Sequence, residues 1–216
     1  SLARSPATSP NNASPISWSH TVGNNNNRIL VVTTSQRSAA IPTGITYAGT
    51  PMTQMVRSDS NAVIFSTIWY LINPPVGTAN IVVTYAASPN HFQGNGISLY
   101  NVNQTNPVDA QAGANALSPG PISTTITTTT PGAWIVDVAA MRTQLSETIT
   151  PSIMANRVTR ENTSLSAPIG VRTGVTTVGP AATAGAYVMS WNTSHVAGCV
   201  TANSCMWAIS AVAFKP

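Results

Sequence analysis

The residues that could carry acid–base or nucleophilic chemistry are few and scattered. The chain has three histidines, His20, His91 and His195, and five acidic residues. It contains no G-x-S-x-G motif, which would place a serine nucleophile at a sharp strand-to-helix turn. His20 lies in the strand-like run Ser-Trp-Ser-His-Thr, where we expect it to occupy one face of a strand. The sequence therefore predicts no catalytic residue.

The acidic residues do not form the patterns that glycosidases need. Such enzymes place two carboxylates on either side of one sugar bond. Asp137, within Val-Asp-Val-Ala-Ala, is expected to be an acid at the edge of the core, paired with an arginine such as Arg142. Glu147 and Glu161 lie in loop-like stretches, where we expect surface ion pairs with Arg142, Arg157 or Arg160.

Neither a metal nor a cofactor is predicted. No D-x-D run marks a calcium loop, although a site built from carbonyl groups with Asp109 or Asp59 stays open. A zinc site at Cys199 and Cys205 would need further ligands, and only His195 lies nearby. In an oxidising compartment these two cysteines would close a short loop, so we expect a disulfide, with free buried thiols as the alternative.

The composition indicates a neutral protein with a surface of hydroxyl and amide groups. Of 216 residues only 6% are charged, against about 25% in an average protein. The net charge of +4 arises from scattered basic residues, so no nucleic-acid surface is expected. No apolar stretch is long enough for a membrane-spanning helix. Such a surface favours an extracellular protein, and a start at Ser1 without Met is typical of a chain whose signal peptide has been removed.

Two surface features could involve carbohydrate. Asn103, Asn162 and Asn192 begin Asn-x-Ser/Thr sequons and are candidate glycosylation sites, with Asn103 and Asn162 expected in loops. The five tryptophans lie inside strand-like runs, where we expect them to pack in the core. Exposed rings would instead indicate binding to surface glycans.

Short β-branched and aromatic runs, separated by Gly, Pro and Asn, predict about ten strands. The expected strands are 28–34, 62–72, 79–86, 97–102, 123–130, 133–141, 148–154, 165–173, 186–192 and 207–214. No apolar period of 3.6 residues is sustained, and no internal repeat is visible in the sequence. The pattern predicts an all-β, antiparallel two-sheet sandwich, jelly-roll-like, formed by residues 16–216 as a single domain.

Two strand pairs are expected as hairpins because their links are short. These are 62–72 with 79–86, and 123–130 with 133–141. The best candidate for a helix is 107–116, where we expect one or two turns at most.

Residues 1–15 are rich in Pro, Ser, Asn and Ala, which predicts an extended N-terminal arm. An arm of this composition needs a partner to be ordered, either on its own domain or on a neighbouring copy. The residues expected to contact another subunit are Ala3, Arg4, Ser5, Pro6, Ala7, Thr8, Ser9, Pro10 and Ile16.

Seven segments follow one another in the order SWSHTVG (17–23), NRILVV (27–32), ITYAGTPMT (45–53), IWYLINPPVGTANIVVTY (68–85), YNVNQTNPVDA (100–110), AWIVDVAA (133–140) and WAISAVAFKP (207–216). Their order resembles a β-sandwich module of secreted bacterial and phage-like structural proteins. The resemblance implies a sandwich fold in an extracellular setting, and no assigned activity.

We therefore expect a structural subunit that polymerises with copies of itself, not an enzyme. In this hypothesis the arm adds a strand to a neighbour's sheet. A carbohydrate-binding or adhesive module and a phage or viral fibre or decoration protein are the alternatives. An arm that lies on its own body, with no other copy touching it, would overturn the polymer hypothesis.

Overall fold

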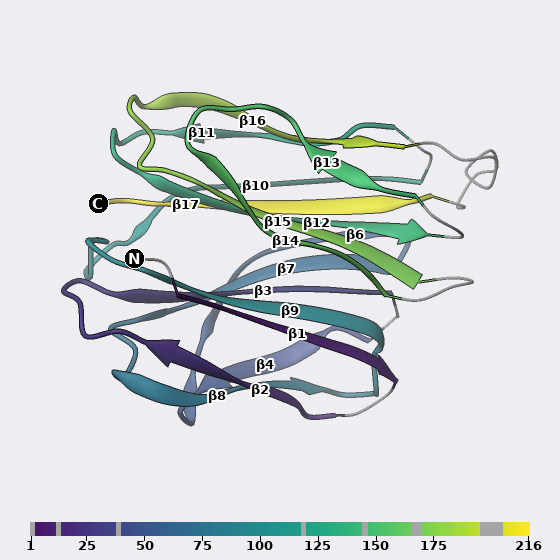
Figure 1. Cartoon of the computed structure of the whole chain (residues 1–216), viewed down its shortest axis with the longest axis horizontal. Coiled ribbons are helices and arrows are strands. Elements are labelled where there is room, and N and C mark those ends of the chain that lie inside the picture. The colour runs from purple at the N-terminus through teal and green to yellow at the C-terminus, as the bar shows by residue number, and fades with distance from the viewer. Residues whose placement is uncertain are drawn as a thin grey trace.

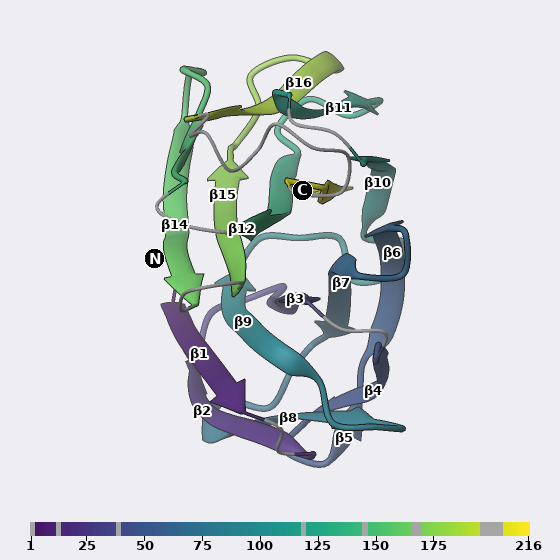
Figure 2. The same cartoon turned by 90° about the vertical axis from the view of Figure 1, so that its right-hand side faces the viewer.

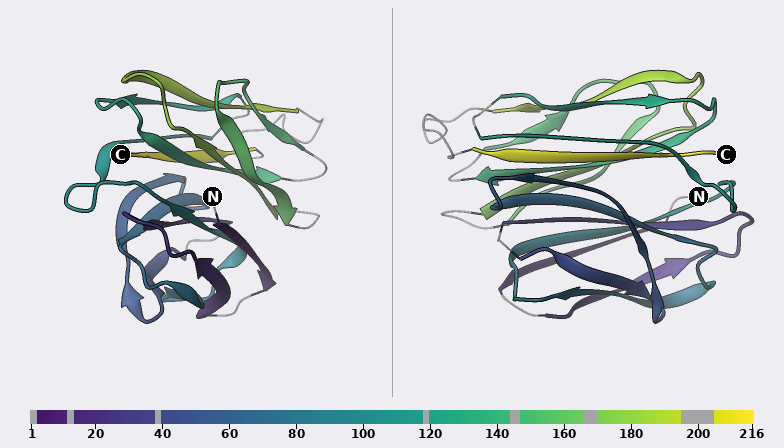
Figure 3. Two further views of the ribbon diagram at one scale, coloured as in Figure 1. Left: turned by 60° about the vertical axis from the view of Figure 1, so that its left-hand side comes forward. Right: turned by 180° about the vertical axis from the view of Figure 1, so that it is seen from behind.

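The computed structural model describes residues 3–11, 14–37, 40–117, 120–143, 147–165, 170–194 and 205–216. Within these residues the regular structure is entirely β, and every paired strand is antiparallel to its neighbours. The predicted all-β, jelly-roll-like sandwich is confirmed, but it has four sheets where we expected two. The sheets are stacked as layers (Figure 1), and the same layers are seen from behind (Figure 3).

The first part of the chain forms one outer and one inner sheet. The outer sheet, sheet B, contains in order β2 (Ile16–Val22), β8 (Gly77–Tyr85), β4 (Pro42–Tyr47) and β5 (Thr50–Pro51). The inner sheet, sheet A, contains in order β1 (Ala3–Asn11), β9 (Asn90–Leu99), β3 (Ile29–Arg37), β7 (Ile64–Ile72) and β6 (Thr53–Ser60).

The second part of the chain repeats this arrangement. Its inner sheet, sheet C, contains in order β10 (Val108–Ala116), β17 (Trp207–Phe214), β12 (Trp134–Thr143), β15 (Gly170–Val178) and β14 (Arg157–Leu165). Its outer sheet, sheet D, contains in order β11 (Ile122–Thr128), β16 (Gly185–Thr193) and β13 (Ile149–Pro151). When the strands of the two halves are matched in chain order, with the short β5 left out, the order of sheet A becomes the order of sheet C. Each half is therefore a jelly roll.

The residue register confirms that the two halves are equivalent. Val31 pairs with Tyr70 and Ile97 in sheet A, and Val136 pairs with Thr177 and Val212 in sheet C. A β-bulge interrupts β6 between Gln54 and Val56, and a bulge interrupts β14 between Thr159 and Glu161. Counted along the register, the two bulges fall at the same place. The structure thus shows an internal repeat that we did not find in the sequence.

The burial pattern explains which strands form which layer. The outer strand β2 alternates buried and exposed residues, because one face meets sheet A and the other meets solvent. The inner strands β3 and β17 are buried along almost their whole length, because both faces are covered. Separate apolar clusters fill each half, and two further clusters lie between sheets A and C.

The halves face each other through sheets A and C about an approximate two-fold axis. β6 lies on β10 and β17, and its counterpart β14 lies on β1 and β9 (Figure 2). The contact of β6 with β10 and β17 in one place is thus repeated by the contact of their counterparts, β14 with β1 and β9, in the other. The two subunits of a symmetric dimer meet in the same way. The contact of β6 with β10 and β17 is the more extensive of the two.

Three local predictions were wrong. β7 and β8 belong to different sheets, and so do β11 and β12, so neither pair is a hairpin. Their short links carry the chain from one layer to the next, as most connections in a jelly roll do. The segment expected as a helix is β10, whose Ala and Gly residues pair with β17.

Candidate functional site

The first strand is the candidate site that the sequence singled out. β1 is extended, as predicted, and it pairs antiparallel with β9 of its own chain, from Ala3 opposite Ser98 to Asn11 opposite Asn90. In the single chain the arm therefore lies on its own body, at the edge of sheet A. Pairing with another copy is not needed to give it a partner.

The link after β1 is anchored by a serine. The Ser14 hydroxyl donates to the Tyr85 carbonyl oxygen at 3.3 Å and accepts from the Tyr85 backbone N–H at 3.2 Å. Ile16, the last residue predicted in the arm, is buried in the core of the first half. The chain is therefore fixed to sheet B from residue 14 onward, and β1 is the part that precedes this anchor.

The equivalent strand in the second half, β10, is held more closely. A Cβ atom at Gly113 would collide with the Ser58 hydroxyl of β6 and would lie 3.3 Å from the Ile209 carbonyl oxygen. The Ser60 hydroxyl donates to the Ala116 carbonyl oxygen at 2.8 Å. Counted along the register, Pro6 stands in β1 where β10 has Gly113. β6 can thus approach β10 closely.

A buried ion network lies in the second half, and the sequence identified only one of its members. Asp137 pairs with Arg157 at 3.2 Å, not with the predicted Arg142. The same oxygen, Oδ2, accepts the indole N–H of Trp191 at 2.7 Å, while Oδ1 accepts from the backbone N–H and the hydroxyl of Thr176. The alternation of side chains along β12 explains the partner, because Arg142 faces sheet A, on the opposite side of sheet C from Asp137. Arg157, the first residue of the edge strand β14, lies on the same side as Asp137.

The network is structural in its chemistry. Burial raises the pKa of the Asp137 carboxyl, while Arg157, Thr176 and Trp191 oppose that shift. Burial likewise lowers the pKa of Arg157, and Asp137 opposes it. The guanidinium also donates to the Ser190 carbonyl oxygen at 2.8 Å. Because both Asp137 oxygens already accept two bonds and are shielded from solvent, they have no free position for a substrate.

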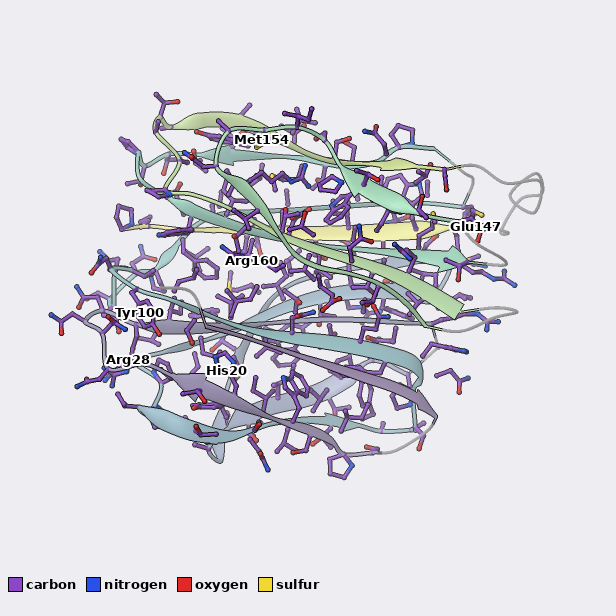
Figure 4. The ribbon with its side chains drawn as sticks, in the orientation of Figure 1. His20, Arg28, Tyr100, Glu147, Met154 and Arg160 are labelled. Atoms are coloured by element: carbon purple, nitrogen blue, oxygen red, sulfur yellow. The ribbon has the colours of Figure 1, made fainter. Side chains whose placement is uncertain are left out.

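His20 lies on a strand face, as predicted, and that face is buried (Figure 4). Its Nε2 is 2.8 Å from the Ser98 hydroxyl, and its ring meets Tyr47 edge-on at 6.2 Å. Burial lowers the His20 pKa from 6.5 to about 4. The five tryptophans and five tyrosines are all buried or half-buried, so the described residues offer no exposed aromatic platform for a sugar.

The predicted disulfide and glycosylation sites are placed only in part. Cys205 is buried, but Cys199 lies outside the described residues, so their pairing stays a prediction. Asn103 is exposed in a loop, where its side-chain oxygen accepts from the Thr105 N–H at 3.0 Å. Asn162 and Asn192 are exposed, but both lie in strands, and Asn162 Nδ2 donates to the Ile149 carbonyl oxygen.

The remaining acids occupy structural positions. Both Asp109 oxygens accept bonds from the Thr129 and Thr130 turn, which lowers the Asp109 pKa although its partial burial acts to raise it. Asp59 pairs with Arg57 on the surface at 3.2 Å. Glu147 and Glu161 are buried, so the surface position expected for them was wrong.

Across the part of the chain that the structure describes, no three His, Cys, Asp or Glu side chains converge as metal ligands would. Nor does this part contain a helix with the length and hydropathy to cross a membrane. Comparison with known protein families, with curated proteins and with solved structures finds no match to this chain. The family resemblance of the motifs therefore stays a prediction.

Proposed function

We propose that the protein is an extracellular structural subunit that assembles with copies of itself, and that β1 links the subunits. In this proposal β1 leaves the edge of its own sheet and pairs with β9 of a neighbouring copy. The exchange of an identical element between copies costs little, because it forms the same contacts that it breaks. The position of β1 in the single chain is then the starting state of the exchange.

The observation that supports this proposal is the difference between β1 and β10. β10 packs closely against β6 through Gly113, whereas β1 has Pro6 at the equivalent position and the less extensive contact with β14. Two prolines in β1 also lack the backbone N–H that a sheet uses. Of the two equivalent edge strands, β1 is thus the easier to release.

The low charge supports the same proposal. With 6% charged residues, copies of the chain repel each other weakly, which suits close assembly. A glycan-binding role has less support, since the tryptophans and tyrosines of the described residues are buried or half-buried.

An exchange experiment with paired cysteines tests the proposal. Asn11 lies opposite Asn90 at the end of the β1–β9 pair, so N11C/N90C places two cysteines at facing backbone positions, where a disulfide can form. Protein labelled with ¹⁴N and protein labelled with ¹⁵N are mixed, allowed to assemble and oxidised. We expect linked peptides that join the two labels.

The matched control is A112C/A211C, which places cysteines opposite each other in β10 and β17. We expect its disulfide to form only within one label. Two results would overturn the proposal: N11C/N90C peptides that never join the two labels, or a protein that stays monomeric at every concentration tested.

A further inference from the structure

The two seams between the halves differ in chemistry. In the first, which we call the closed seam, β6 and β7 meet β10, β17 and β12. Three of its hydroxyl groups are bonded: that of Ser60 donates to the Ala116 carbonyl oxygen, and those of Ser66 and Ser210 lie 2.9 Å apart. Ser210 additionally donates to the Ser66 carbonyl oxygen at 3.1 Å.

In the second seam, which we call the polar seam, β9 and β3 meet β14 and β15. Thr33 and Asn95 are opposite each other in register, Gln93 is two residues along β9 on the same face, and Thr163 lies across the interface on β14. Thr33, Gln93 and Asn95 are each 1% exposed. Their unpaired atoms, together with that of Thr163, are Thr33 Oγ1, Gln93 Oε1 and Nε2, Asn95 Oδ1 and Thr163 Oγ1.

The repeat shows that the fold does not require polar groups at these positions. Counted along the register, the closed seam has Val138 for Thr33, Ala208 for Gln93 and the bonded Ser210 for Asn95. Val138 and Ala208 are buried in apolar clusters. The second half therefore satisfies the same positions with apolar or paired side chains.

Buried polar atoms without a partner are rare, because their desolvation is not offset by a bond. A group of them on facing strands instead indicates a bound molecule that bonds to all of them. The atoms are uncharged and include both a donor and acceptors, which fits a small neutral ligand. Water fits this set, since an internal water molecule bonds to two to four otherwise unpaired groups.

We infer that the polar seam binds ordered water between the two halves, whereas the closed seam is dry. The halves are then joined by direct contact along β6 and β10. In the polar seam the Ser35 and Thr173 hydroxyls bond directly to each other, and water joins the halves at the four side chains with unpaired atoms. This inference concerns the monomer and does not depend on the proposed function.

Magnetisation transfer between water and the side-chain amide of Gln93, measured by NMR on the full chain, tests the inference. We expect a cross-peak whose sign marks a long-lived water molecule, and we expect Q93E to remove the amide signal and so identify it. Absence of that cross-peak in the parent protein would overturn the inference.

Thermal unfolding of two variants at equivalent positions of the two halves, T33V and V138T, gives a second readout. In a hydrated seam, T33V removes one bond to the water and lowers the Tm, whereas in a dry seam it removes an unpaired hydroxyl and raises the Tm. The matched control, V138T, places a hydroxyl in the closed seam and should lower the Tm. A higher Tm for T33V would overturn the inference.

Discussion

The cores of the two halves use opposite chemistry at one equivalent position. In the first half the residues are apolar and share one cluster: Val32, Met52, Trp69 and Val83. In the second half the residues that hold the same register form the buried ion network: Asp137, Arg157, Thr176 and Trp191. One backbone arrangement thus accommodates either an apolar cluster or a fully bonded ion pair.

The difference shows what the jelly roll demands of its sequence. Each core position must be filled and each buried polar atom must be hydrogen-bonded, but the side chains may be either apolar or polar. Asp137 meets this condition because Arg157 and Trp191 reach it from two different strands. A buried pair of this kind is weak evidence for added stability, since apolar residues of similar volume often do as well.

The largest expected effect comes from breaking the ion pair in the second half. D137V leaves the Arg157 guanidinium, whose side chain is 3% exposed, without its partner. We expect a loss of about 3–5 kcal/mol in the free energy of unfolding, because the uncompensated charge stays buried. The double variant D137V/R157M copies the first half at these two positions and should recover at least half of that loss. Urea denaturation at pH 7 measures both.

The exposed pair Arg57–Asp59, at 37% exposure of each side chain, provides the control. D59V should change the free energy of unfolding by about 1 kcal/mol or less, since solvent screens such pairs. If the double variant were as unstable as D137V alone, the two halves would not be interchangeable at this position.

The next effect concerns His20, whose equivalent in the second half is the apolar Ile126. Burial lowers the folded-state pKa of His20 to about 4, so the unfolded chain binds the proton first as the pH falls. Stability contributed by neutral His20 is complete above about pH 6.5 and is lost between pH 6.5 and 4. The loss should reach about 3 kcal/mol.

Urea denaturation from pH 7.5 to 4 checks this dependence. H20Q cannot take up a proton, so its curve should fall less steeply than that of the parent protein over the same range. Parallel curves for the two proteins would mean that His20 is protonated equally in the folded and unfolded states.

The class of fold followed from the sequence, but the layers did not. Alternating runs and turn residues indicate strands, yet a short link looks the same whether it closes a hairpin or crosses to another sheet, as between β7 and β8. β9 was predicted only from residue 97, because Gly94 and Gly96 resemble a loop. Gly94 is there since a Cβ atom would lie 2.7 Å from both Trp18 and Phe92.

The repeat was hidden because its equivalent residues have diverged in chemistry. Val32 and Asp137, or Met52 and Arg157, share no property that a sequence comparison could detect. Only the register and the two bulges reveal the equivalence. The candidate site was predicted in its extended form, but composition cannot show which sheet edge an arm will fill, and β1 fills that of its own chain.

The smallest expected effect concerns the packing of Trp191 in sheet D against Gly174 in sheet C. Trp191 is larger than its equivalent Val83, and the residue beneath its ring is Gly174, where the first half has Thr67. A Cβ atom at Gly174 would lie 2.8 Å from Trp191 Cζ2 and nearer still to two other ring atoms. G174A should therefore cost about 1–3 kcal/mol through overpacking.

Gly44 provides the matched control, because a Cβ atom there would meet nothing within 4 Å. G44A should range from neutral to about 1 kcal/mol more stable, since alanine restricts the unfolded chain. Urea denaturation compares the two variants directly. If G174A were as mild as G44A, the Trp191 ring could shift without cost. In that case a glycine at position 174 would not be required for Trp191 to fit where the first half has Val83.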